Sequence, residues 1–162
     1  DRQREGLVQT MSIAKNIALS NIGKYTNPLG LIDKSKEDAA EAEMIKDVHI
    51  KVADKDLPIL SLSGGNQQKV VIAKWLTRDS DILIFDEPTR GIDVGAKNEI
   101  YKLMNRLAAE GKSIIMISSE MTEVLRMSDR IIIMCEGKVT GCIDISEATQ
   151  ENIMDKATRN ID

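Results

Sequence analysis

The chain has 162 residues, of which 42% are hydrophobic, 30% are charged and 2% are aromatic, and its formal net charge is -4. This balance is typical of a globular domain with a real core and excludes a disordered polyelectrolyte. A mildly acidic chain with so few aromatic residues lacks the basic stripe and the stacking platforms of a nucleic-acid-binding protein, so we expect no nucleic-acid partner. No apolar run approaches the ~20 residues that a membrane-spanning helix requires.

The first third of the chain is predicted to be helical. Residues 1–6 are polar and begin without methionine, which indicates that the chain was cut from a longer protein, with a solvated basic arm as the alternative. Ser12 is expected to cap a short helix, and either Asp33 or Ser35 a second one that ends near Val52. Residues 1–61 therefore form an N-terminal segment and a small α-helical subdomain, and residues 62–162 form the second part of the chain.

Ser63, Gly64 and Gly65 stand directly before a helix-period pattern. At such a helix start, free backbone N–H groups and the positive end of the helix dipole point outward, and small residues let a phosphate approach the backbone. The alternative is an ordinary N-cap with a flexible lead-in.

Ile82 to Phe85 form an uninterrupted apolar run, which predicts a short strand buried on both faces. Asp86 and Glu87 follow at the carboxyl end of the strand, the edge where open α/β sheets bind ligands, although such a pair can also merely end a turn. Asp86 is suited to Mg²⁺, held through water, and Glu87 to orienting an attacking water.

Further along, a helix is expected from about Val94 to Ala109, and Gly111 ends it. Buried strands are expected at 113–117 and 131–134, with a helix at 121–127 between them. This order predicts an α/β fold with a parallel sheet and right-handed crossovers.

The end of the chain is predicted to be a hairpin and a helix. Cys135 and Cys142 flank a turn at Glu136 and Gly137, and we expect both to be small buried apolar residues of a reducing compartment, a disulfide being the minor alternative. Residues 146–157 are expected to close the chain with a helix capped by Ser146.

Taken in this order and separated by a single helix, the two motifs resemble those of the ATP-binding cassette (ABC) ATPases. The run 62–69 resembles the signature motif of that family, and 82–89 resembles its Walker B strand with the catalytic glutamate. Asn66 stands where glutamine is commoner. With the three residues that follow it, this variant resembles the second cassette of the tandem-cassette ATPases that energise bacterial monosaccharide importers of the ribose and galactose type.

The resemblance implies a partial P-loop NTPase (ABC ATPase) fold, in which a parallel sheet with flanking helices is joined by a small α-helical signature subdomain. It implies ATP and Mg²⁺ as cofactors, with Asp86 at the metal and Glu87 catalytic. The signature would act in trans, on a nucleotide held by a partner cassette. The residues expected to contact nucleotide are Ser63, Gly64, Gly65, Asn66, Gln67, the D-loop residue Asp93, and Ser119.

Two departures from the family pattern concern the chain's own ATP site. Ser119 occupies the position of the usual switch histidine, and a serine cannot offer the charge of an imidazolium, so this site is expected to be slow or inactive. No Walker A loop occurs in the 162 residues. The chain alone is therefore expected to bind ATP poorly, to leave an apolar sheet face exposed and to self-associate.

The implied partners are a second cassette, membrane permease subunits that contact the α-helical subdomain and, indirectly, a periplasmic or surface sugar-binding protein. The implied location is the cytoplasmic face of the membrane. Two alternatives stay open, namely an ABC ATPase of the translation or DNA-repair type and a non-catalytic interaction module.

Overall fold

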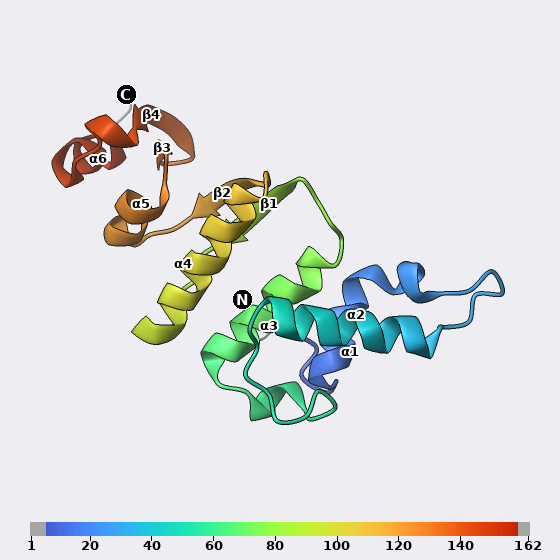
Figure 1. Ribbon diagram of the computed structural model, residues 1–162. Coiled ribbons are helices and arrows are strands. Elements are labelled where there is room, and N and C mark those ends of the chain that lie inside the picture. Colours follow the sequence, from blue (N-terminus) through green and yellow to red (C-terminus); the bar gives the residue numbers. More distant parts are fainter. Residues whose placement is uncertain (1–5, 159–162) are drawn as a thin grey trace. The chain divides into compact units, whose positions relative to one another are not determined.

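A computed structural model describes residues 6–158 (Figure 1). None of the helices within this range is both long and apolar enough to cross a bilayer. In chain order, the elements are α1 (Ile13–Ala18), the 3-10 helix η2 (Leu19–Tyr25), α2 (Lys34–Asp47), η3 (Ile59–Ser61), α3 (Gly64–Leu76), β1 (Ile82–Asp86), α4 (Val94–Ala109), β2 (Ser113–Ile117), α5 (Met121–Met127), β3 (Arg130–Cys135), β4 (Lys138–Asp144), η4 (Ile145–Glu147) and α6 (Gln150–Ala157).

The described residues fall into two compact units. Unit 1 comprises residues up to 83 and 89–114, and unit 2 comprises 84–88 and residues from 115 onward. Unit 1 therefore groups the signature helix α3 with the N-terminal helices. The functional boundary expected between residues 61 and 62 stays a prediction.

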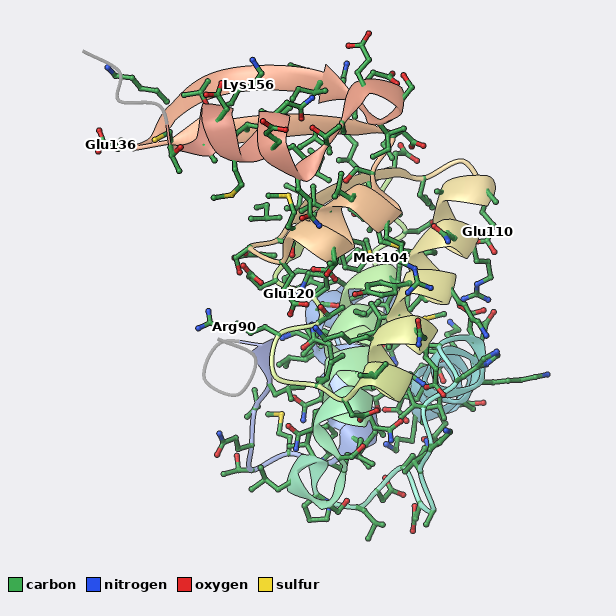
Figure 2. The ribbon with its side chains drawn as sticks, turned by 90° about the vertical axis from the view of Figure 1, so that its left-hand side faces the viewer. Arg90, Met104, Glu110, Glu120, Glu136 and Lys156 are labelled. Carbon is green, nitrogen blue, oxygen red and sulfur yellow. The ribbon has the colours of Figure 1, made fainter. Side chains whose placement is uncertain are left out.

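The core of unit 1 lies where α1 packs against α2 and α3, and where α4 packs against α3. The pattern of α4 predicted both of its ends correctly, because the Asp93 side chain caps its first turn and Gly111, at φ 93°, ends it. Met104 is buried on α4, whereas Glu110 lies exposed at its C-terminal end (Figure 2). The largest fully buried apolar side chains of this core are those of Ile13, Ile17, Ile59, Val70 and Ile100.

For the N-terminal helices, the capping residues were predicted correctly, but one helix end was not. Ser12 caps α1 and Asp33 caps α2, as expected. The expected end of α2 near Val52 was wrong, since the helix stops at Asp47. His49 adopts a left-handed backbone with φ 54°, and the bonds from Ile50 N to Ile45 O and from His49 N to Lys46 O form a Schellman motif.

Replacing His49 with glycine is expected to raise the free energy of unfolding by about 1 kcal/mol, because a left-handed backbone costs roughly 1–2 kcal/mol for a residue with a Cβ atom. Urea unfolding would measure this gain. His49→Ala is the control, since it removes the imidazole and keeps the strain. An equal gain in both variants would show that the imidazole, and not the backbone, is unfavourable.

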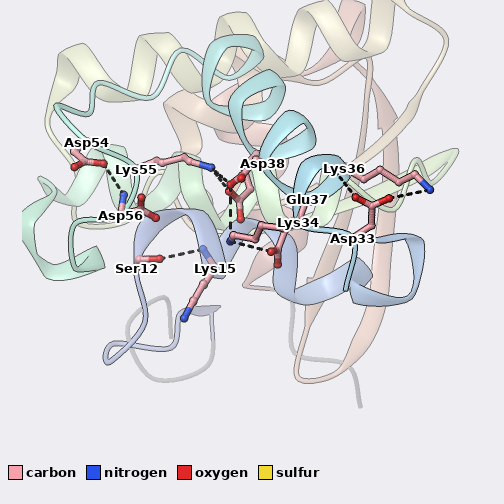
Figure 3. Close-up of polar contacts among 11 residues, drawn as sticks. Ser12, Lys15, Asp33, Lys34, Lys36, Glu37, Asp38, Asp54, Lys55 and Asp56 are labelled. Carbon is pink, nitrogen blue, oxygen red and sulfur yellow. Dashed lines mark hydrogen bonds and ion pairs between the residues drawn. The ribbon is translucent and has the colours of Figure 1, made fainter. Parts of the chain in front are cut away.

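A cluster of charged side chains ties the loop before the signature to α2 (Figure 3). Lys55 binds the carboxylates of Asp38 and Glu41, and Glu41 is only 1% exposed. Burial lowers the pKa of Lys55, but the two carboxylates outweigh it and raise the pKa above its ordinary value. The backbone carbonyl of Lys55 also accepts a hydrogen bond from Ala14 N. The loop is therefore held on both sides.

Strands β1 and β2 form a two-stranded sheet. At the start of the strands Ser113 N donates to Asp81 O, and at their end Glu87 N donates to Ile117 O, so the strands run parallel. The expectation that both faces would be buried was wrong. Residues along β1 alternate between exposed and buried, so only one face is covered within the described residues.

The third predicted strand does not join this sheet. β3 pairs antiparallel with β4, and α6 packs on the buried face of this hairpin. The Lys156 side chain on α6 lies over the hairpin (Figure 2), where a Cβ atom added at Gly141 would come within 2.5 Å of its Cδ. Because Thr149 forms a capping box with Asn152, α6 begins after Thr149 and not at the predicted Ser146.

The two cysteines are free, as expected, but they are not both buried. Cys135 is half-buried and Cys142 is exposed. Cys142 pairs with Ile132 on the outer side of the hairpin, whereas Ile131 and Ile143 form the inner pair. Alternation along the strand therefore sets the exposure of Cys142, which its apolar character alone does not predict.

Candidate functional site

The tip of α3 presents the first motif to solvent. Ser63 is exposed at the N-cap position with an extended backbone, and Gly64 is half-buried behind it. The Ser63 side chain makes no capping bond to the helix backbone, so the capping contact typical of an ordinary N-cap serine is absent. The first N–H groups of an α-helix have no acceptor within the helix, and such groups can bind an anion.

Gly65 is buried against the start of α4. A Cβ atom added there would lie 2.5 Å from the Cβ atom of Ala96, a distance that real side chains do not reach. Asp93 caps the same turn of α4, its Oδ1 accepting from Ala96 N at 2.9 Å. The structure therefore brings the signature glycine and Asp93 together, through the close packing of two helix starts.

Asn66 and Gln67 have different surroundings. The Asn66 amide bonds to Ser63 Oγ and to the backbone N of Lys51. Gln67 is only 6% exposed, and its amide donates to Leu62 O at 3.1 Å. Its Oε1 has no hydrogen-bond partner among residues 6–158. Gln67 thus supports the loop before the helix, and its contact with nucleotide stays a prediction.

Lys69, one turn further along α3, is buried to 2% exposure, which its sequence position gave no reason to expect. Its Nζ donates to His49 O at 2.8 Å and to the Glu99 carboxylate. The hydrogen bond from Lys69, opposed by partial burial, holds the pKa of Glu99 below its ordinary value. Lys69 therefore links the end of α2, the signature helix and α4.

The acidic pair lies in unit 2, at the end of β1. Asp86 is exposed, and Glu87 has a left-handed backbone with φ 47°. The Glu87 carboxylate accepts a hydrogen bond from Ser119 N at 2.9 Å. The structure thus joins the predicted catalytic glutamate to the residue at the switch position, and the contact uses the backbone of Ser119.

The donor set around Asp86 is compatible with Mg²⁺ bound together with a nucleotide. No group of three or more metal-ligating side chains gathers in the described part of the chain. Mg²⁺ commonly takes only one or two carboxylates and completes its shell with phosphates and water. The exposed carboxylate of Asp86, at a strand end, is a suitable single ligand of this kind.

The predicted site residues thus form two groups. The tip of α3 and Asp93 belong to unit 1, and Asp86, Glu87 and Ser119 belong to unit 2. Each group has the chemistry expected of half an ATP site, with backbone donors in the first and carboxylates in the second.

The family model described as ABC transporter matches residues 2–90, more than half of the 162 residues. The chain belongs to the ABC transporter family. The match includes all of α3 and β1, and it ends at residue 90, three residues after Glu87.

Relatives of this ABC chain carry names that refer to sugar import. It is 54% identical over 159 residues to a ribose/galactose/methyl galactoside import ATP-binding protein 3 of Burkholderia ambifaria, covering 98% of this chain and 31% of the relative. It is also 54% identical over 155 residues to the ribose import ATP-binding protein RbsA of Clostridium perfringens, covering 95% of this chain and 31% of that protein. The chain therefore spans about a third of the length of these curated relatives.

Solved structures with the same fold include two of the ATP-binding cassette MJ0796. One is a dimeric post-hydrolysis state bound to ADP and Pi, with a TM-score of 0.73 at 24% identity over 86% of this chain and 59% of that one. The other is a dimeric structure of the same bacterial ABC transporter cassette, with a TM-score of 0.71 at 25% identity and the same coverage. The likeness confirms the ABC ATPase fold that the motifs predicted.

Proposed function

We propose that this chain is the signature-bearing part of an ATPase that energises monosaccharide import of the ribose and galactose type. The observation that carries the proposal is the tip of α3, where Ser63 is exposed and its side chain makes no capping bond to the helix backbone. The names of the relatives, which refer to ribose and galactose import, support the substrate class.

In this proposal the tip acts on ATP held by a partner cassette. The Ser63 hydroxyl and the N–H groups of residues 64–66 donate to the γ-phosphate, and the dipole of α3 favours the charge that develops there during hydrolysis. Such donors cost no reorganisation when the charge appears, because α3 already holds them in place. Gly65 lets α4 approach, so Asp93 lies beside the same phosphate-binding turn.

The second group of residues forms the chain's own, slower site. Mg²⁺ supplies charge neutralisation for the phosphates there, and Asp86 would hold it. Glu87 orients water, but its carboxylate is engaged by Ser119 N. Without an imidazolium at position 119, less of the developing charge is compensated. Most of the chain's contribution is therefore made at the partner's nucleotide.

The α-helical segment of unit 1 is the part we assign to the permease. A groove of about 360 Å³ between α1, η2 and the start of α2 is lined mainly by apolar side chains, among them Met11, Leu19 and Ile22. Leu29 and Leu31, in the loop between η2 and α2, are 84% and 64% exposed. An apolar groove and exposed leucines on the same helical segment suit a short helix of a permease on the cytoplasmic face of the membrane. A sugar-binding protein would act through that permease.

ATP hydrolysis by the complete importer that contains this sequence tests the proposal. Ser63→Ala is expected to lower the sugar-stimulated rate by roughly 10- to 100-fold, the usual loss for one hydrogen bond to a charged group. Glu87→Gln is expected to change the rate by no more than a few-fold. Ser61→Ala is the matched control, because that nearby hydroxyl donates to the Pro58 carbonyl at 2.7 Å, in the loop before the helix.

Two outcomes would contradict the proposal. An unchanged rate in Ser63→Ala would show that the tip of α3 does not act on nucleotide. A rate that does not respond to any sugar-loaded binding protein would favour a non-transport ABC ATPase, and no hydrolysis at all would favour a non-catalytic module.

A further inference from the structure

The Asn66 side chain lies between the signature serine and a distant loop. Its Oδ1 accepts from Lys51 N at 2.9 Å, and its Nδ2 donates to Ser63 Oγ at 3.1 Å. Asn66 occupies the third position of α3, from which a side chain often folds back to the N-cap backbone. Here the amide instead contacts the N-cap hydroxyl.

These two contacts determine the direction of the amide. A backbone N–H can only donate, so the group that faces Lys51 N must be the amide oxygen. The group that faces Ser63 Oγ is therefore the NH₂ group, which can only donate. The assignment follows from the chemistry of the two partners and removes the usual ambiguity of an asparagine side chain.

The direction of the amide in turn determines the direction of the serine hydroxyl. Because Ser63 Oγ accepts a hydrogen bond from Asn66, its own hydrogen cannot point back along that line. The Oγ atom makes no bond to the helix backbone either. The hydroxyl hydrogen is thus free to be donated outward, which is the polarity that a phosphate oxygen requires.

The loop that fixes the amide is itself firmly held. Lys51 follows the Schellman turn at His49, whose carbonyl accepts from the buried Lys69 Nζ at 2.8 Å. The Lys51 side chain reaches Glu99 on α4, with Nζ 3.2 Å from Oε1. The N–H group that orients Asn66 therefore comes from a segment anchored to both α3 and α4.

We propose that Asn66 is a positioning residue that presents the Ser63 hydroxyl as a hydrogen-bond donor to the γ-phosphate of the partner cassette's ATP. The proposal rests on the proposed function, because it presumes that Ser63 acts on that phosphate. Asn66 touches no reacting atom in this scheme and acts through Ser63. The sequence signal was only that asparagine stands where glutamine is commoner, and the loop contact 15 residues away could not be foreseen.

Asn66→Asp tests the proposal, because aspartate has the same shape and can still accept from Lys51 N. Its second oxygen can only accept, so it would take the Ser63 hydrogen and turn the hydroxyl inward. In the complete importer we expect kcat for ATP hydrolysis to fall by roughly tenfold with KM for MgATP nearly unchanged, since the partner cassette holds the nucleotide. Gln68→Glu adds the same charge two positions further along α3 and is expected to leave kcat within about twofold.

The decisive measurement is a double-mutant cycle. In a Ser63→Ala background, Asn66→Asp and the apolar isostere Asn66→Leu should have almost no further effect on kcat, because the group they act through is gone. A loss of the same size in both backgrounds would overturn the proposal and assign Asn66 a general structural role. Equal losses of kcat in Asn66→Asp and Gln68→Glu would show that the added negative charge, and not the contact with Ser63, lowers the rate. If Ser63→Ala alone has no effect, the proposed function fails instead.

Discussion

Replacing Gly65 with alanine is expected to lower both the free energy of unfolding and the rate of ATP hydrolysis. The added Cβ atom would lie 2.5 Å from the Cβ atom of Ala96, so the starts of α3 and α4 must move apart. Overpacking of this kind typically costs about 1–3 kcal/mol of the free energy of unfolding. The phosphate-binding turn would be displaced with α3, and a shift of about 1 Å can cost roughly 100-fold in rate.

The geometry also predicts how to reverse this defect. Once the Ala96 Cβ atom is removed, the nearest atoms to the new methyl group are Ala96 Cα and Asp93 Oδ2, both at 3.9 Å, an ordinary contact distance. The double variant Gly65→Ala, Ala96→Gly should therefore recover most of the stability and rate that Gly65→Ala loses. Urea unfolding and ATP hydrolysis of the complete importer measure both losses.

Gly23→Ala is the matched control for this pair. Its added Cβ atom would meet nothing within 4 Å, so both stability and rate should stay close to those of the parent protein. A Gly65→Ala variant as stable and active as the control would contradict the packing argument. A loss that Ala96→Gly fails to relieve would show that Gly65 is required for another reason, such as backbone freedom.

The second large effect concerns the 162-residue chain studied by itself, which is expected to form dimers or larger assemblies. Ile84 of β1 and Ile115 and Ile117 of β2 lie on one face of the sheet and are 67%, 52% and 51% exposed. The in-register parallel pairing places Ile84 beside Ile115. A second copy of the chain is the most readily available cover for this apolar face and for the open strand edges.

Size-exclusion chromatography with light scattering would measure this association. The variant Ile84→Lys, Ile115→Lys is expected to shift the isolated chain to a monomer, since two adjacent charges cannot be buried in a shared apolar contact. Leu29→Lys is the control, because Leu29 is 84% exposed but lies in unit 1. A parent chain that elutes as a clean monomer would refute the prediction.

The sequence predicted those elements whose ends are marked by local chemistry. Asp93 and Gly111 enclose α4, and both are recognisable from residue type alone. The end of α2 was missed because histidine, and not glycine, adopts the left-handed turn at position 49. β1 was predicted to be buried on both faces because an unbroken apolar run does not reveal whether both sides will find neighbours within the same chain.

The same distinction between local and tertiary features applies to the candidate site. Ser63 to Gly65 could be placed at a helix start because the glycines and the helix pattern are adjacent in the sequence. The contacts that hold this tip could not be predicted, since Asn66 meets Lys51 and Gly65 meets Ala96 only after the helices have packed. Spacing locates a motif, whereas its supporting contacts depend on tertiary structure.

The left-handed backbone of Glu87 sets the stability of the fold against the presence of a carboxylate at the end of β1. Glycine would adopt φ 47° without penalty, so the fold gives up on the order of 1 kcal/mol to keep a side chain there. A glycine at this position that improved thermal resistance would therefore also remove the hydrogen bond that Ser119 N donates to the carboxylate.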